Sequence, residues 1–594
     1  MREKFFYLSL IKSLVIALFI ILVVAQAGKK FVLDEIDFPA VAYATSETGV
    51  PVYYRGEENQ KHIGIYHPPL YIYSLAGFVK AFGYSEKTIR MFGALCTLVT
   101  AFLSILIVAK LFPNKNEEQY FPLIFLPLFL IHPYTLANTT LPDIDQTVLP
   151  ITILLFIYFL LKKFPSQKLT ESSSIQTASQ ALAVLTLSIL FALNLWTKMT
   201  TPLALLPTAF FILMVLGYAL RRSLAIVALI AIFGTVWFLT SYWIYCHYFD
   251  LPFEYTFQFL VHSFTKGTSG AGSFSATLEK ILVNISYLKQ FANWLTVPFI
   301  FVLFLSLAYL TAKKNKSESE KILMVLSLFG VFVSIFYLSL IAPFGRFFKY
   351  PYPVFSLVVL PIAYFLTSHL FSAQLEEKLE TIKRRRWLTI ETQNMALGVI
   401  FVLVFIPTAL NQLFLAKDLA ILADHPISFY MLFSVSSVAI LLGTLSQRAG
   451  LQKLFKYSAP AMLAVLLGSQ LGISRSQAVA EYPTKYEYGQ TGMNETVAYL
   501  KSHVAPAEVI WSMKDVGYYV NNKYIENYGY IFDPSLESKL ADIIRTKHVR
   551  YFVVTQGIGQ DRVDAYPTLK RSLDSCCIID QEFGNFVIYK AKIQ

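Results

Sequence analysis

Charged residues are scarce in this sequence. They make up 15% of its 594 residues, whereas soluble globular proteins contain about a quarter. In their place stand apolar runs of about 20 residues, each long enough to cross the hydrocarbon core of a bilayer as a helix. The scarcity of charge excludes an ordinary soluble protein, and the recurring runs predict a mainly α-helical polytopic membrane protein.

Cysteine is also rare, with only Cys96, Cys246, Cys576 and Cys577 present. Their spacing fits neither a metal-binding motif nor a disulfide framework. The adjacent pair could form a vicinal disulfide, but we expect two buried strand residues. The C-terminal region lacks a GxGxxG fingerprint, a P-loop and a nucleophile elbow, which argues against catalysis there.

The apolar runs predict about 13 transmembrane helices. Their expected centres lie near Val15, Leu103, Phe125, Leu154, Leu190, Phe210, Ile232, Phe301, Val331, Leu360, Val404, Val435 and Leu466. The first run is longer than the apolar core of a signal peptide, so we expect it to be retained as a span. Basic residues gather in alternate short loops, as the positive-inside rule requires with a cytoplasmic N-terminus. The net charge of +12 therefore reflects topology, and no nucleic-acid partner is expected.

This topology defines two expected domains in the cytoplasmic (inner) membrane. Residues 1–474 form the transmembrane domain, with long extracytoplasmic loops at 28–90 and 247–293. The first loop contains an expected interfacial helix at 68–82, and the second contains a glycine-rich segment at 266–273 that could be a lid or a plain connector. Residues 475–594 read as a small extracytoplasmic α/β domain with helices near 494–503 and 534–547 and strands near 508–513, 549–555 and 586–590.

Two acidic clusters lie just outside predicted spans on the outer side. Asp34-Glu35-Ile36-Asp37 follows the first span, and Asp143-Ile144-Asp145 precedes the fourth. A carboxylate at a bilayer boundary is costly, so Asp34 and Glu35 fit a general base or a metal ligand; a solvated helix end is the alternative. Asp143 and Asp145 could share a divalent ion or divide two roles, although Asp is also a favoured helix N-cap.

Three cations occupy short outer loops where the positive-inside rule disfavours them. These are Lys198, Arg346 and Lys349. A lipid phosphate is the natural partner for such exceptions, and snorkelling to headgroups is the alternative. In the string His67-Pro68-Pro69, the prolines fix an extended chain that directs His67 toward the membrane surface.

Together these motifs carry a family resemblance. The first loop contains an acidic pair after the first span, then His67 to Tyr71 (HPPLY), then Phe82 to Arg90 (FGYSEKTIR). This order resembles the GT-C glycosyltransferases, in the branch of protein O-mannosyltransferases and lipid A aminoarabinose transferases. The resemblance is specific over 34–90 and architectural over the spans. It implies a GT-C fold, a polyprenyl-phosphate-linked sugar donor and an inverting displacement. The chain departs from the family pattern at Ile36-Asp37, where relatives have a basic residue.

The resemblance also assigns expected roles. Asp34 matches the first-loop catalytic carboxylate and would be the general base; Asp143 or Asp145 matches the second acid and would orient the acceptor or sugar. These three aspartates would hold a divalent metal ion if one is used. The expected donor and phosphate contacts are His67, Lys198, Arg346, Lys349 and Glu35.

We therefore expect an inverting glycosyltransferase that acts on a lipid, polysaccharide or protein hydroxyl at the extracytoplasmic face, among membrane lipids. A lipid-linked sugar flippase or transporter is the main alternative, and a non-catalytic glycan-assembly subunit is the second. Transporters keep ionisable groups near the midplane and often contain repeats. Here the charges lie at one face and no repeat is visible, which favours the enzyme.

Overall fold

The computed structural model describes most of the chain. The described residues are 2–31, 34–55, 60–63, 67–112, 115–141, 143–167, 175–254, 256–258, 294–338, 349–371, 429–446, 449–479, 491–527, 535–556, 563–564 and 566–592. The chain divides into two compact units. Unit 1 comprises residues 1–25, 66–71 and 90–479, and unit 2 comprises residues 26–65, 72–89 and 480–594. The segment after the first span thus belongs to the same unit as the C-terminal region.

Unit 1 is built from helices. They are α1 (Arg2–Ala27), α4 (Glu86–Leu111), α5 (Lys115–Leu130), α6 (Pro133–Thr139), α7 (Val148–Lys163), α8 (Ile175–Thr197), α9 (Leu205–Val215), α10 (Leu220–Tyr248), α13 (Val297–Ala312), α14 (Glu318–Phe336), α15 (Phe355–Leu370), α19 (Phe429–Leu445) and α20 (Ala449–Val479). In the described part of unit 1, three short 3-10 helices lie between them: η1 (Ile144–Gln146), η3 (Thr201–Ala204) and η6 (Tyr352–Val354).

Several of these helices can cross a membrane. Among the described residues, seven are long and apolar enough, or eight if α5 and α6, bent by 65° at their break, form one span. Every predicted centre lies in a helix except Val404, which falls outside the described residues. The chain is an integral membrane protein, but the number thirteen is not confirmed, because α9, α13 and α19 are shorter apolar helices.

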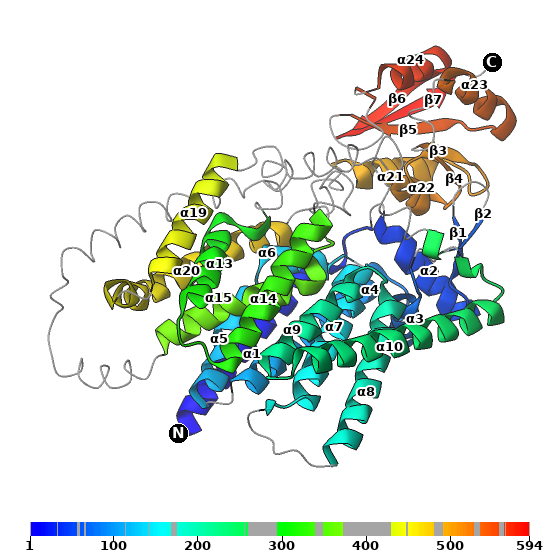
Figure 1. The fold of residues 1–594 in the computed structure, drawn as a ribbon. Helices are drawn as coiled ribbons and strands as arrows, with labels where there is room; N and C mark the ends of the chain where they lie inside the picture. Colours follow the sequence, from blue (N-terminus) through cyan, green and yellow to red (C-terminus); the bar gives the residue numbers. More distant parts are fainter. Residues whose placement is uncertain are drawn as a thin grey trace. The chain divides into compact units, whose positions relative to one another are not determined.

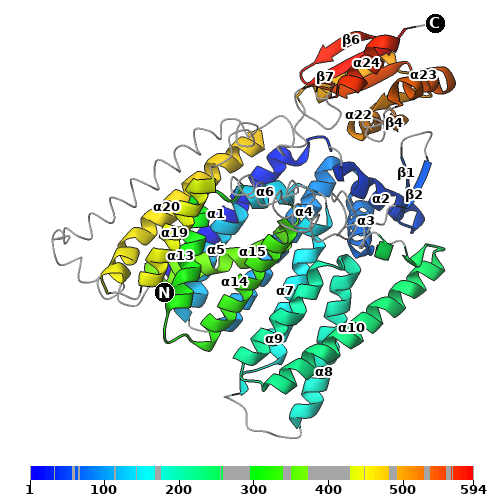
Figure 2. The same ribbon diagram turned by 45° about the horizontal axis from the view of Figure 1, so that its top comes forward.

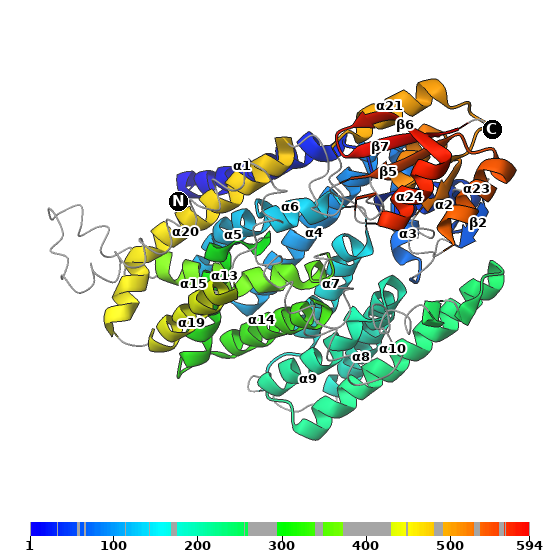
Figure 3. The same ribbon diagram turned by 90° about the horizontal axis from the view of Figure 1, so that it is seen from above.

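Small residues allow close helix packing in unit 1. Helix α8 lies along α10 (Figure 2), and α13 lies along α19 (Figure 3). At Gly234 of α10, an added Cβ would come within 2.9 Å of the Ser188 carbonyl oxygen of α8. Glycine at such crossings lets membrane helices approach closely. Elsewhere on α10, Trp237 and Trp243 are 56% and 55% exposed, as expected of a lipid-facing helix.

Unit 2 contains a five-stranded sheet and its helices. Their bounds are α2 (Asp34–Thr48), β1 (Val52–Arg55), β2 (Gln60–Ile63), α3 (Leu70–Phe82), α21 (Met493–His503), β3 (Ile510–Ser512), α22 (Lys514–Val520), β4 (Tyr524–Glu526), α23 (Leu536–Lys547), β5 (Tyr551–Thr555), α24 (Pro567–Cys576), β6 (Cys577–Phe583) and β7 (Phe586–Ala591). Strands β1 and β2 form a separate antiparallel hairpin. The larger sheet has the order β4-β3-β5-β7-β6, parallel on the β4-β3-β5 side and antiparallel around β7.

The sheet of unit 2 carries helices on both faces (Figure 1). Phe552 and Val554 of β5 share a buried cluster with Leu540 of α23 and Leu573 of α24. The predicted elements of this region are all present, but α22, β4, α24 and β6 were not predicted. The expectation for the adjacent cysteines is wrong for Cys576, which ends α24 and is only half-buried, whereas Cys577 is buried at the start of β6.

Candidate functional site

The acidic cluster of unit 1, Asp143-Ile144-Asp145, lies between α5 and α7, where the chain forms the short helices α6 and η1. His132 caps the N-terminus of α6 by accepting a hydrogen bond at Nδ1 from the Tyr134 amide (3.1 Å), and Pro133 suits the first helical position because it needs no amide hydrogen. Helix α6 ends at Thr139, and η1 begins after Asp143. The two aspartates therefore lie at the start of η1, in the short connection that follows α6.

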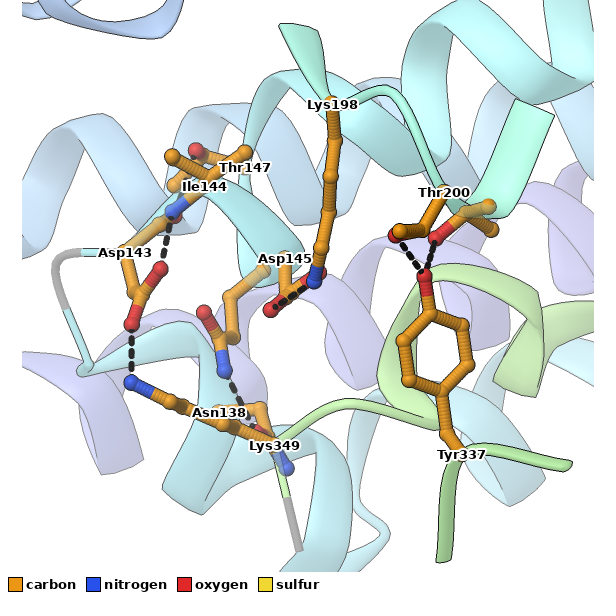
Figure 4. A network of polar contacts seen from close by, with 11 residues as sticks. Asn138, Asp143, Ile144, Asp145, Thr147, Lys198, Thr200, Tyr337 and Lys349 are labelled. Carbon is orange, nitrogen blue, oxygen red and sulfur yellow. Dashed lines mark hydrogen bonds and ion pairs between the residues drawn. The ribbon is translucent and has the colours of Figure 1, made fainter. Parts of the chain in front are cut away.

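Asp143 uses both carboxylate oxygens. One accepts a hydrogen bond from the Ile144 amide (2.6 Å), which caps η1. The other accepts a hydrogen bond from Lys349 Nζ (2.5 Å) in an ion pair whose side chains are 6% and 12% exposed. The N-cap alternative is thus realised for Asp143, but it coexists with a buried ion pair (Figure 4).

Asp145 forms a second ion pair that is almost fully buried. Lys198 Nζ donates to both carboxylate oxygens, at 2.6 and 2.8 Å, and the side chains are 3% and 4% exposed. Burial raises the pKa of Asp145 to about 6, against the opposing effect of Lys198. Burial alone would lower the pKa of Lys198, but the Asp145 carboxylate together with Tyr337 and Tyr350 outweighs burial, and the pKa of Lys198 rises above its ordinary value. The pair is ionised at neutral pH.

Two tyrosine rings surround the Lys198 ammonium. Its Nζ lies 5.0 Å from the ring centre of Tyr337 and 4.7 Å from that of Tyr350, within range of cation–π attraction. Thr200 and Thr201 both form hydrogen bonds with the Tyr337 hydroxyl (Figure 4). Sequence reasoning missed these rings; the signal available was the position of Tyr350 directly after Lys349.

His67 also belongs to unit 1, where it lies close enough to Lys198 and Lys349 to feel their charges. It keeps some exposed surface, yet burial, followed by the positive charges of Lys198 and Lys349, lowers the pKa of His67 to about 3. The imidazole is therefore neutral at pH 7. As a neutral group it could bind a phosphate through a hydrogen bond but not through charge. The role of phosphate contact expected from the sequence is therefore limited to hydrogen bonding.

The first-loop acids belong to unit 2. Asp34 is the first residue of α2 and not the end of the preceding span, because α1 ends at Ala27; its side chain lies outside what the structure describes. Glu35 is 2% exposed, and Asp37 accepts a hydrogen bond from Lys514 Nζ (2.6 Å). Arg346 and the glycine-rich segment 266–273 lie outside the described residues.

The carboxylates of unit 1 do not suit a divalent metal ion in this arrangement. Asp143 and Asp145 already bind lysine ammonium groups at 2.5–2.8 Å, and two adjacent cations repel a third. No group of three or more His, Cys, Asp or Glu side chains within the described ranges has metal-binding geometry. We therefore derive no step through a metal.

Comparison with known proteins gives matches in structure. Neither a protein-family model nor a curated protein sequence matches the chain. A crystal structure of ArnT from Cupriavidus metallidurans bound to undecaprenyl phosphate aligns over 98% of this chain and 99% of that chain, with a TM-score of 0.57 and 13% identity. The apo state of the same protein covers 100% of both chains, with a TM-score of 0.54 and 13% identity. At this identity the similarity concerns the fold, and the chain has the GT-C fold of membrane glycosyltransferases.

Proposed function

We propose that this protein is a glycosyltransferase that moves a sugar from a polyprenyl-phosphate-linked donor to an acceptor hydroxyl at the extracytoplasmic face, with inversion at the anomeric carbon. The acceptor is a lipid, a polysaccharide or a protein. The fold supports the reaction class, since ArnT was solved with undecaprenyl phosphate bound. The roles of Lys198, Lys349 and His67 rest on the chemistry of their side chains, and that of Asp34 on the family resemblance.

The observation that carries the proposal is the buried group of two lysines and two aspartates in unit 1. Burying an ion pair costs several kcal/mol per ion before the mutual attraction is counted. Two such pairs at adjacent positions are therefore not explained by a contribution to stability alone. A lysine ammonium held in a protein interior is suited to neutralising a phosphate.

Donor binding would change the partners of these lysines. The phosphate oxygens compete with the carboxylates of Asp143 and Asp145 for Lys349 and Lys198. As the bond between the anomeric carbon and the phosphate oxygen breaks, negative charge grows on the leaving phosphate, and the ammonium groups stabilise it. His67, being neutral, donates at most one hydrogen bond to the same group.

The acceptor hydroxyl needs a base to take its proton as its oxygen attacks the anomeric carbon. We assign this role to Asp34, on its match to the first-loop carboxylate of the family. Asp145 and Asp143, once released from the lysines, orient the hydroxyls of the sugar or the acceptor. Glu35 and Arg346 complete the proposed donor contacts.

Transfer from a purified polyprenyl-phosphate sugar tests the assignment. The double variant Asp143→Asn with Lys349→Met removes one ion pair without leaving an unpaired buried charge, and we expect kcat/KM to fall at least about 100-fold. The matched control is Glu320→Gln with Lys313→Met, which removes another lysine–carboxylate pair of unit 1 (2.5 Å) and should leave kcat/KM within about twofold.

The base assignment has its own test. An Asp34→Asn variant should retain donor binding and lose transfer. A folded Asp34→Asn protein with full activity contradicts the role of Asp34. Purified protein that moves a lipid-linked sugar from one leaflet of a vesicle membrane to the other without cleaving it would instead support the transporter alternative.

A further inference from the structure

Helix α22 holds the segment that contains Asp34. All of the contacts concerned lie within unit 2, which includes residues 26–65, 72–89 and the whole C-terminal region. The helix is short, but Lys514 and Tyr518 are four residues apart and thus lie on one face, with Tyr519 next to them. All three side chains bond to residues between Phe31 and Glu86.

The first contact is an ion pair. Lys514 Nζ donates to Asp37 Oδ2 at 2.6 Å, and the side chains are 7% and 17% exposed. Asp37 lies in the first turn of α2, three residues after Asp34. A pair this sheltered from water constrains α2 more strongly than a surface ion pair, which contributes little.

The second contact acts on the other side of Asp34. The Phe31 amide donates to the Tyr519 hydroxyl at 2.6 Å, and this hydroxyl donates in turn to Glu86 Oε1 at 2.9 Å. The Lys30 ammonium lies 5.2 Å from the centre of the Tyr519 ring. One side chain of α22 thus fixes the chain three residues before Asp34.

A third contact reaches the segment between α3 and α4. The hydroxyls of Tyr84 and Tyr518 are 2.7 Å apart and share a hydrogen bond. Burial raises the pKa of Tyr84 and of Tyr519 above their ordinary values, so both remain neutral hydrogen-bonding groups at any working pH. The contacts do not depend on titration of these tyrosines.

We propose that α22 is a positioning element for the proposed catalytic base, with Lys514 and Tyr519 as its positioning residues. They bind the chain three residues after and three residues before Asp34, so the backbone that carries Asp34 is held from both sides. The inference rests on the proposed role of Asp34. It makes the C-terminal domain a working part of the enzyme and not an appendage.

The physical consequence concerns kcat. A general base must lie within hydrogen-bond reach of the proton it accepts, and a displacement of about 1 Å can lower a rate about 100-fold. Loosening the segment should therefore lower kcat while leaving the KM for the lipid-linked donor nearly unchanged, because the proposed donor contacts Lys198 and Lys349 belong to unit 1.

Tyr519→Phe is the main test, since it removes one hydroxyl and keeps the ring. We expect kcat for sugar transfer to fall at least tenfold, with donor KM within twofold. Tyr499→Phe is the matched control, because Tyr499 also donates to a carboxylate of the same domain, Asp580, at 2.6 Å. Its kcat should be unchanged.

The ion pair allows a rescue. Lys514→Met should lower kcat, Lys514→Arg should retain most of it, and the exchanged pair Asp37→Lys with Lys514→Asp should recover part of it. Neutralising the exposed pair Arg545–Asp542 of the same domain should have no effect. Unchanged kcat in Tyr519→Phe and Lys514→Met overturns the proposal.

A double variant separates positioning from general damage. If Tyr519 acts through Asp34, adding Tyr519→Phe to Asp34→Asn should lower the residual rate no further. A tenfold additional loss in the Asp34→Asn background means that Tyr519 supports the fold only, and it overturns the proposal. A folded Asp34→Asn protein with full transfer activity overturns the base assignment on which the proposal rests. Loss of transfer in Asp34→Asn with unchanged kcat in Tyr519→Phe and Lys514→Met overturns the positioning role alone, so the two failures are distinguishable.

Discussion

Lys198 and Lys349 show how a charge is tolerated in an apolar chain. Each was singled out by its position in a loop where lysine is disfavoured, and each binds an aspartate from the second acidic cluster. The sequence predicted separate roles for them, with the lysines binding phosphate and the aspartates orienting the acceptor or sugar. An anionic ligand that binds either lysine would therefore compete with a carboxylate.

Removing one partner of the buried pair should destabilise the protein. Lys198→Met leaves the Asp145 carboxyl buried without its partner, and we expect a loss of about 3 kcal/mol in the free energy of unfolding at neutral pH. Adding Asp145→Asn should recover part of this loss. Denaturation in detergent measures both.

Lys313→Met provides the comparison, because Lys313 is 33% exposed and its pair with Glu320 is partly solvated. Its loss should be about 1 kcal/mol or less. Equal losses for the two lysine variants contradict the buried character assigned to Lys198.

Activity should depend on the ionisation of Asp145. Its folded-state pKa of about 6 lies above the ordinary value of 3.8, so the folded protein takes up this proton before the unfolded chain does. The contribution of Asp145 to stability is therefore fully present below about pH 4 and falls as pH rises through 6, while the ion pair exists only above 6.

We expect the transfer rate to fall as pH drops below about 6, because Asp145 takes up one proton, while the protein stays folded. A pH–rate profile from 5 to 8, with thermal midpoints recorded alongside, measures this. A flat profile over that range contradicts the assignment.

Among the helices, α4 contacts the end of α6 just before the turn that carries the two aspartates. Gly93 of α4 faces the Thr139 carbonyl, where an added Cβ would come within 2.1 Å of the oxygen, and the hydroxyls of Thr97 and Thr139 are 2.8 Å apart. Asp143 follows four residues after Thr139. A shift of α6 therefore moves the turn that carries both aspartates.

Gly93→Ala should destabilise the protein by about 1–3 kcal/mol and lower transfer, because the clash is with backbone that cannot rotate away. Gly468→Ala on α20 is the matched control, since nothing lies within 4 Å of its added Cβ; it should be neutral or slightly stabilising. Thermal midpoints in detergent compare the two. A Gly93→Ala protein as stable as Gly468→Ala contradicts the close contact.

The short elements were the hardest to predict. Helix α22 and strand β4 span seven and three residues, too few for a hydrophobic period to be recognised. Helix α21 and strand β5 were predicted because each carries several buried apolar residues. Helix α22, which holds the segment around Asp34, could therefore not be predicted from the sequence.

Across the full chain, the distribution of Lys and Arg predicts the orientation in the membrane. The loop between α13 and α14, which holds Lys313, Lys314 and Lys316, should be cytoplasmic, and the C-terminal domain should be extracytoplasmic. A reporter enzyme active only outside the cytoplasm should be active when fused after Gln594 and inactive when fused at Asn315. The reverse pattern contradicts the orientation and the proposed face of reaction.

The sequence by itself determined that the chain is a membrane protein, where most of its helices lie and which residues are out of place. These properties follow from local composition, because an apolar run of about 20 residues needs no partner to be recognised as a span. The first-loop motif likewise indicated the GT-C fold from a short contiguous stretch.

Only the tertiary structure decided which charges meet. Lys198 and Asp145 are 53 residues apart, Lys349 and Asp143 are 206 apart, and Lys514 and Asp37 are 477 apart. Such pairs depend on how helices and loops pack, and nothing in the local sequence of one partner specifies the other. The same packing decided that α22 bonds to the chain on both sides of Asp34.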